Sequence, residues 1–316
     1  MIYFIHLILS FILFLIVNWI GKHSISVGYM QLSMFLRNDE APAFNLLFRV
    51  LTPIIFILII SYIFYSLELD YLVISIYNVI IYYFVIRFIV NILFGRSKLV
   101  NWPRQIIMAS ISVISGYFIY QSIIITKSNL MPDFSTISNE LWLIVIIFVY
   151  QLFNKISVPN EATKKRKNSY LISRYNLYSS KYDSIIKSKV VDKKIEALIY
   201  SILLYEAFNR PKVVRLIENI VFRFKKSGTL GIMQVTSSKM IGDKKSVELG
   251  IEKILNDYKR IKLRIEEEEF SEEYLFRHTI SQYNSGSEYL DEICELFDII
   301  TQNFYKDVYK NFRLSY

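Results

Sequence analysis

The sequence contains few residues that could form covalent cross-links or bind metals. Cys294 is the only cysteine, and there are three histidines among 316 residues. A single cysteine excludes a disulfide within the chain and says little about the compartment. Three scattered histidines and one cysteine lack the ligand spacing of a metal site. We therefore predict no metal and no cofactor.

Charged residues are also scarce, and they are unevenly distributed. They make up 21% of the chain against 53% hydrophobic residues, and most of them lie in residues 157–316. The formal charge of +9 could indicate a nucleic-acid partner. However, the basic residues cluster beside apolar segments and are not interleaved with stacking aromatics. We expect the partner to be a lipid bilayer, and we expect no nucleic acid.

The first half of the chain is dominated by apolar residues in long runs. In lipid, every backbone N–H and C=O group must be hydrogen-bonded within its segment, so each run is expected to be a helix. The predicted spans are residues 2–20, 44–67, 69–94, 105–126 and 141–156. The predicted fold is therefore all-α, with a bundle of about five transmembrane helices in residues 1–156.

The charges between these spans predict an orientation. The tail before the first span has no Lys or Arg, whereas basic residues follow the first, third and fifth spans. The positive-inside rule places the N-terminus outside and the C-terminal half in the cytoplasm. Arg87 falls within the third span, where it either snorkels toward one end or serves as a functional membrane charge.

A polar segment joins the two halves. Residues 157–169 contain Pro159 and a basic run, which indicates a juxtamembrane linker. Anionic lipid head groups are the expected partner of that run. Its residues are Lys164, Lys165, Arg166 and Lys167.

Residues 170–316 have the apolar spacing of helices and are predicted to form one α-helical domain. We expect helices at residues 193–208, 213–224, 247–269, 270–283 and 289–304. Ser246 is predicted to cap the third of these, and residues 225–229 are predicted to be a loop. About 150 residues are enough for one compact domain.

Glu206 has the surroundings of a catalytic acid. It lies inside the apolar run of residues 199–208. An apolar pocket raises the pKa of a carboxyl group, because burial penalises its charged form. Such a group can protonate the leaving oxygen of a glycosidic bond. The alternative is that Glu206 is an exposed residue on an amphipathic helix.

Three short motifs, in chain order, support the interpretation of Glu206 as a catalytic acid. They are Glu206-Ala207-Phe208-Asn209, then Gly231-Ile232-Met233-Gln234, then Gln282-Tyr283-Asn284-Ser285-Gly286. Together they resemble the superfamily of lytic transglycosylases and goose-type lysozymes, over about residues 190–310. A late Tyr305 resembles that superfamily's last conserved element. The resemblance implies a lysozyme-like fold for this half and cleavage of peptidoglycan glycan strands.

The resemblance also implies roles for single residues. Glu206 would be the general acid and then the base, and the substrate's own groups would attack the anomeric carbon to give an anhydro-muropeptide. Met233 and Gln234 would line the sugar groove, although Met233 could equally pack in the core. Tyr283 and Asn284 would orient the sugar and the acid, and Tyr305 would also bind the substrate. Gly231 and Gly286 would belong to the structural motif, with Gly286 allowing a tight turn.

The sequence departs from the superfamily pattern in two places. Ala207 stands where a Ser usually follows the catalytic Glu. An insertion at about residues 212–226 contains Glu218, which would be the acid if the alignment through the insertion is wrong. An inverting hydrolase would need a second carboxylate ~6.5–9.5 Å from the first, and Glu218 or Asp243 could supply it.

The predicted orientation conflicts with the implied substrate. In a bacterial cytoplasmic membrane the peptidoglycan lies outside, whereas the loop charges place the C-terminal half inside. Either one span is miscounted, or the domain reaches its substrate only after membrane damage or export. The third possibility is a non-enzymatic multi-pass membrane protein, such as a stress or anti-phage effector or sensor, that reuses a lysozyme-like domain for binding.

Overall fold

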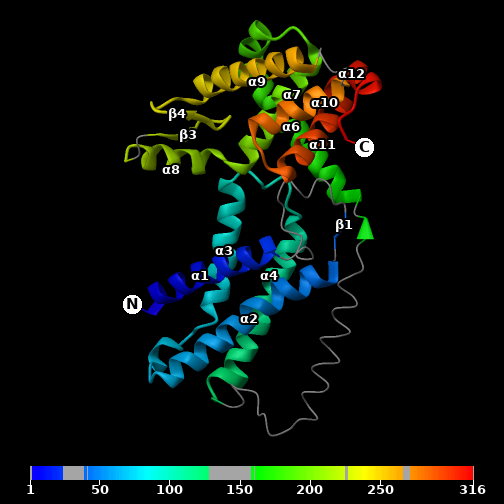
Figure 1. Cartoon of the computed structure of the whole chain (residues 1–316). Coiled ribbons are helices and arrows are strands. Elements are labelled where there is room, and N and C mark those ends of the chain that lie inside the picture. The colour runs from blue at the N-terminus through cyan, green and yellow to red at the C-terminus, as the bar shows by residue number, and fades with distance from the viewer. Residues whose placement is uncertain are drawn as a thin grey trace. The chain divides into compact units, whose positions relative to one another are not determined.

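The computed structural model describes residues 2–23, 39–40, 42–127, 158–159, 161–224, 227–265 and 271–315. These residues are mostly helical, as the sequence predicts. They divide into two compact units with a boundary near residue 161, and each unit is described here by itself (Figure 1).

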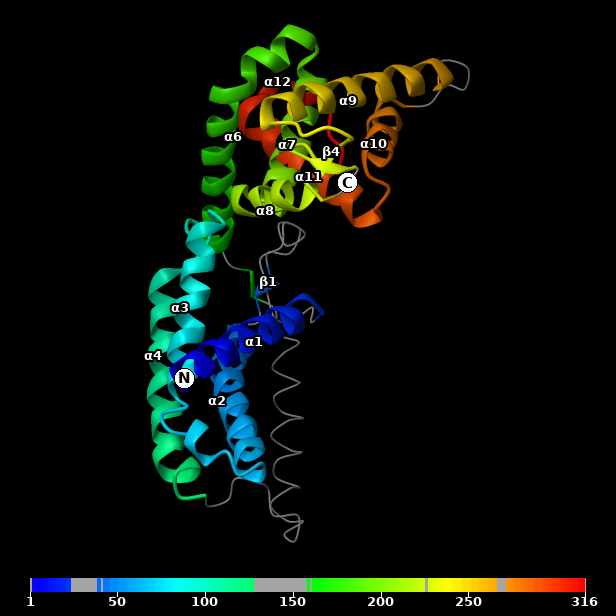
Figure 2. The ribbon, with the colours of Figure 1, turned by 90° about the vertical axis from the view of Figure 1, so that its left-hand side faces the viewer.

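The N-terminal unit is built from apolar helices. They are α1 (Ile2–His23), α2 (Pro42–Ser66), α3 (Asn78–Leu93) and α4 (Trp102–Ile119), which continues as a π-helical turn, η3 (Tyr120–Ile124). A 3-10 turn, η2 (Asp70–Leu72), precedes α3, and β1 (Asp39–Glu40) pairs antiparallel with β2 (Val158–Pro159). Helix α3 packs against α1 and α4, and α4 packs against α2 (Figure 2).

Among the described residues, three helices rather than five are long and apolar enough to cross a membrane: Ile2–Trp19, Phe48–Ser66 and Trp102–Ile124. The predicted third span, residues 69–94, is wrong in length, because only the 16 residues of α3 are helical. At 1.5 Å per residue, α3 is ~24 Å long, shorter than a hydrocarbon core of ~30 Å. The start of the segment forms η2 and a turn in which Ser75 has φ 58°. The predicted fifth span, residues 141–156, lies outside the described residues.

Buried polar side chains in this unit are hydrogen-bonded to the backbone or to each other. His6 Nε2 lies 2.9 Å from the carbonyl oxygen of Leu72, and Ser10 Oγ donates to the carbonyl of Val79 at 3.0 Å. Arg87 is buried and donates to the hydroxyl of Tyr83 at 2.7 Å. The bonds of His6 and Ser10 join α1 to the segment before α3 and to α3 itself, and the Arg87 bond lies within α3. Leaving such buried polar groups unpaired would destabilise the fold.

The C-terminal unit contains the remaining elements. They are α6 (Glu161–Lys189), α7 (Lys193–Asn209), α8 (Lys212–Phe222), β3 (Gly228–Leu230), β4 (Val235–Ser237), α9 (Asp243–Ile265), α10 (Glu272–Tyr283), α11 (Ser287–Phe304) and α12 (Lys306–Asn311). The predicted helices are found, but the predicted linker is helical from Glu161 onward. The predicted loop at residues 225–229 is wrong at Gly228 and Thr229, which belong to β3 and pair antiparallel with β4 in a short hairpin. Residues 225 and 226 lie outside the described residues.

Helix α7 is the centre of this unit (Figure 1). Asp192 caps its N-terminus by accepting a hydrogen bond from the N–H of Lys194 at 2.8 Å. Residues 195–204 of α7 are all buried, including the apolar positions predicted from the spacing of the sequence. A helix that is apolar on all sides is stable only when it is surrounded. Helices α11 and α9 pack directly against it.

Candidate active site

Glu206 lies in the last turn of the central helix α7, where it is only 8% exposed. Burial raises the pKa of its carboxyl group to about 7, from an ordinary value of 4.5. The Tyr289 hydroxyl and the positive charges of Arg210 and Lys253 offset part of that increase. The carboxyl group is therefore balanced between its two protonation states near neutral pH, as a group that first gives and then takes a proton must be.

Two tyrosines adjoin this carboxyl group, the half-buried Tyr283 and the buried Tyr289. Tyr283, the last residue of α10, donates its hydroxyl hydrogen to the carbonyl of Met233. Tyr289, in α11, has a buried hydroxyl with no hydrogen-bond partner of good geometry among the described residues, yet it lies near enough to Glu206 to affect its pKa. Burial and the Glu206 charge both raise the pKa values of the two phenols, so each stays neutral.

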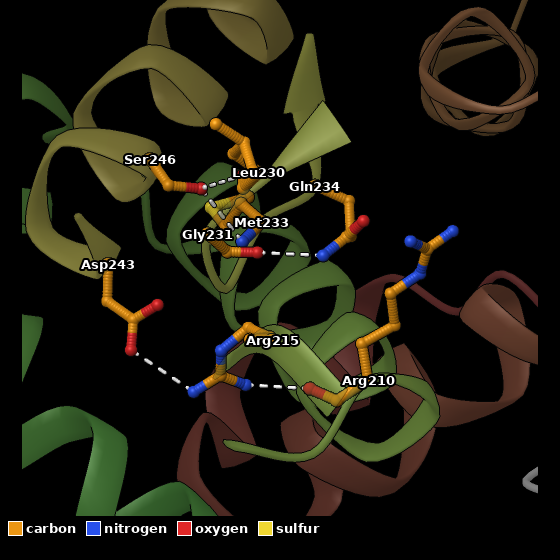
Figure 3. A network of polar contacts seen from close by, with 8 residues as sticks. All are labelled: Arg210, Arg215, Leu230, Gly231, Met233, Gln234, Asp243 and Ser246. Atoms are coloured by element: carbon orange, nitrogen blue, oxygen red, sulfur yellow. Dashed lines mark hydrogen bonds and ion pairs between the residues drawn. The ribbon is translucent and has the colours of Figure 1, made fainter. Parts of the chain in front are cut away.

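The predicted Gly-Ile-Met-Gln motif forms the tight turn between β3 and β4. Gly231 has φ 72° and Gln234 has φ 49°, both in the left-handed region. The Gln234 side chain donates from Nε2 to the carbonyl of Gly231 at 2.9 Å (Figure 3). Its Oε1 atom is buried without a partner among the described residues.

Ser246 fixes the turn from the other side. Its hydroxyl accepts from the N–H of Met233 at 3.0 Å and donates to the carbonyl of Leu230 at 3.1 Å (Figure 3). The prediction that Ser246 caps α9 is wrong, because α9 begins at Asp243 and Ser246 lies inside its first turn. Ser246 stabilises the turn between β3 and β4 and does not cap the helix.

Two glycines allow the turn to approach α9 closely. A Cβ atom on Gly231 would lie 2.2 Å from the Cβ of Ser246, and one on Gly250 would lie 2.8 Å from the sulfur of Met233. Met233 is fully buried, so its side chain packs in the core, one of the two roles predicted for it. Its backbone carbonyl is the part that faces Tyr283.

Two arginines on and before α8 hold the neighbouring carboxylates. Arg215 is buried, donates to the carbonyl of Arg210 at 2.7 Å, and pairs with Asp243 at 3.1 Å (Figure 3). Arg210 itself forms an ion pair with Glu218. Both carboxylates considered as a second catalytic group are therefore bound to guanidinium groups.

A cavity of about 330 Å³ lies between α8 and β3. Arg210 and Glu218 contribute charge to its wall, which is otherwise formed mostly by apolar side chains of α8. Because the N–H of Arg210 bonds to the carbonyl of Glu206 at 2.9 Å, this wall begins one helical turn beyond the candidate acid. The volume lies at the small end of the range for ligand pockets.

Three predicted site residues have other surroundings. Asn284 is exposed and accepts from the N–H of Gly286 at 3.2 Å, so it shapes the turn before α11. Gly286 has φ −69°, which any residue can adopt. Tyr305 donates to Glu196 at 2.9 Å and lies 2.8 Å from the hydroxyl of Tyr175. Glu196 lies ten residues before Glu206 on α7, about 15 Å along the helix, so Tyr305 is not brought to the acid.

Several residues near the site were missed in the sequence. Lys253 is the clearest case, because its ammonium group donates to the carbonyl of Tyr283 at 3.1 Å and lies 4.4 Å from the centre of that ring. Tyr289 could have been found, since it follows the Tyr-Asn-Ser-Gly motif within one helical turn. Nothing in the local sequence around Lys253 or Arg215 distinguishes them from other basic residues.

The basic run at the start of α6 is divided between surface and interior. Lys164 and Lys165 are exposed, whereas Lys167 is buried. The charge of Lys167 acts on Glu295 of α11, whose pKa burial nevertheless raises to about 7. Lys167 therefore lies inside the domain, near Glu295.

Comparison of the chain with protein-family models, with curated proteins and with solved structures finds no match. The functional conclusion therefore depends on the residues and their geometry.

Proposed function

We propose that the C-terminal unit cleaves the glycosidic bond between N-acetylmuramic acid and N-acetylglucosamine in peptidoglycan, as lytic transglycosylases do. The observation that carries the proposal is Glu206, a buried carboxyl group with a pKa of about 7 beside two tyrosine hydroxyls. A general acid is most effective when its pKa lies near the operating pH. The order of the three motifs along the chain supports the same substrate class.

The proposed reaction begins with Glu206 protonated. Its proton passes to the glycosidic oxygen as the bond from that oxygen to the anomeric carbon breaks. Glu206, now a carboxylate, removes a proton from the substrate's own hydroxyl group, which bonds to the anomeric carbon. The product is an anhydro sugar, and Glu206 is protonated again. The Tyr289 hydroxyl and the charges of Arg210 and Lys253 each lower the pKa of Glu206, because they stabilise its carboxylate form. They therefore stabilise the carboxylate that forms between the two proton transfers.

The ion pairs around the site support a single-carboxylate mechanism. An inverting hydrolase needs a second carboxylate that is free to activate water. Glu218 is paired with Arg210, and Asp243 is paired with Arg215. A carboxylate whose oxygen is held in an ion pair is not free to orient and activate a water molecule. A lyase outcome, with no water added, is therefore favoured.

Action on peptidoglycan requires the C-terminal unit to lie outside the cytoplasmic membrane. The short α3 makes such a topology possible. Its residues 78–93 are too few to span a hydrocarbon core of ~30 Å without distortion, so α3 need not cross the membrane. If α3 does not cross and the predicted span at residues 141–156 does, four crossings return the chain to the side of its N-terminus. Reporter fusions after Phe94 and at Tyr316 test this topology directly.

The function is tested with the full chain in detergent on purified peptidoglycan, with products resolved by mass. We expect products one water lighter than those of a hydrolase. Glu206→Gln should lower the rate by about 10²–10⁴-fold, the usual contribution of a general acid. Glu295→Gln is the matched control, because it removes another carboxyl group of raised pKa on a different helix.

Unchanged turnover in Glu206→Gln, or no turnover by the native chain, would refute the proposal. Either result would favour the alternative hypothesis of a non-enzymatic membrane protein. Under that hypothesis a cellular phenotype should survive Glu206→Gln.

A further inference from the structure

Helix α8 exposes a stripe of apolar side chains and buries Arg215 and Phe222. Four large apolar side chains on one side of it are 43–58% exposed: Leu216, Ile217, Ile220 and Val221. Phe224, two residues past the helix end, is 87% exposed. On the opposite side Arg215 is buried, and it donates hydrogen bonds to Asp243 and to the carbonyl of Arg210. We call the five exposed apolar side chains the α8 surface.

This arrangement reverses the usual orientation of a helix in a soluble domain, where the apolar face is turned to the core. Within the C-terminal unit, α8 packs mainly against β3, at one edge of the helical core (Figure 1). Contiguous exposed apolar patches of this kind mark protein or membrane contact sites.

Positive charge borders the α8 surface. Lys212 and Arg223 are exposed, and at 100° per residue both project just beside the stripe that begins at Leu216. The sequence continues with Lys225 and Lys226 directly after Phe224. The one carboxylate on α8, Glu218, is half-buried and paired with Arg210. An apolar stripe edged by Lys and Arg fits the boundary of an anionic bilayer, with apolar side chains in the acyl region and cations at the head groups.

We propose that the α8 surface lies in the interface of a bilayer that contains anionic lipid. The described part of the chain contains three helices long and apolar enough to cross a membrane, so a bilayer is within reach of this unit. A second copy of the chain fits less well, because a two-fold contact would bring the same positive edges together. This inference does not depend on the activity proposed for Glu206.

The test uses the full chain reconstituted in vesicles. In a Cys294→Ala background, a fluorophore is attached at Phe224→Cys or, as control, at Lys259→Cys, an exposed position 16 residues beyond Asp243 on α9. Quenching by nitroxide-labelled lipid is compared with quenching by a water-soluble agent. We expect the ratio of lipid to aqueous quenching to be severalfold higher at position 224, and higher with anionic than with zwitterionic lipid.

A second pair of variants separates apolar from charged contributions. Leu216→Glu with Ile220→Glu should abolish the lipid quenching at position 224, since charged groups are expelled from the acyl region. Arg223→Gln should leave lipid quenching at position 224 in place and reduce only the difference between anionic and zwitterionic lipid. Both changes lie on exposed side chains outside the cavity wall, and circular dichroism should show an unchanged fold.

Equal ratios at positions 224 and 259 would overturn the proposal. So would a label at position 224 that is shielded from both quenchers and cross-links to the same position of another copy, which would identify a protein contact instead.

Discussion

Glu206→Gln should make the protein more stable, and the gain should depend on pH. In the folded state the pKa of Glu206 is about 7, against 4.5 for an ordinary glutamate. Below about pH 4 the carboxyl group is protonated in both the folded and the unfolded state, so the full stability is present. Between 4.5 and 7 the unfolded chain releases the proton and the folded chain keeps it. Stability is therefore lost as the pH rises through this window, because the folded state binds more protons.

The size of the effect follows from the two pKa values. They differ by about 2.5, at about 1.4 kcal/mol for each factor of ten, which gives roughly 3 kcal/mol at pH 8. Glutamine has no charged form, so the variant does not lose this free energy. For a unit of about 150 residues, 3 kcal/mol corresponds to a rise of roughly 6–12 °C in Tm. Near pH 4 the native chain and the variant should unfold at nearly the same temperature.

The assay is thermal unfolding of the full chain in detergent between about pH 4 and pH 8, followed by circular dichroism. Glu295→Gln is the control, because its carboxyl group has a similarly raised pKa but is more exposed. It should give a gain of similar size in the same pH window but leave turnover intact. A Tm difference for Glu206→Gln that stays constant with pH would show that folding does not raise the pKa of this carboxyl group. The argument for a general acid would then fail.

Three further predictions concern the turn and the tyrosines. Gly231→Ala should lower the free energy of unfolding by about 2–4 kcal/mol in chemical denaturation, because φ is 72° and the new Cβ meets Ser246. Gly242→Ala is the control and should change the free energy of unfolding little, because no atom lies within 4 Å of the added Cβ. Ser246→Ala should cost about 1–3 kcal/mol in the same measurement, because two buried backbone groups lose their partner. Tyr305→Phe should leave turnover on peptidoglycan unchanged while Tyr283→Phe reduces it. Equal losses from both tyrosine changes would contradict the placement of Tyr305 away from the acid.

Local patterns in the sequence were sufficient for most of the helices. The apolar spacing at residues 193–208 predicts α7 and its buried positions, because helix period and burial are coupled over a few turns. The same reasoning failed at residues 69–94, where apolar composition continues through η2 and a turn that hydropathy does not register. It also failed at residues 161–169, where the basic run suggested a linker and the chain is helical.

The candidate acid was predictable, but its surroundings were not. The sequence by itself determined that Glu206 lies in an apolar helix and that a glycine turn and a tyrosine motif follow it. Only the tertiary structure decided that Tyr289 and Lys253 adjoin it and that Tyr305 does not, since those contacts join residues far apart in the chain. The tertiary structure also decided that α8 turns its arginine inward and its apolar face outward. Amphipathic spacing fixes which residues share a face, whereas the available partners decide which face is covered.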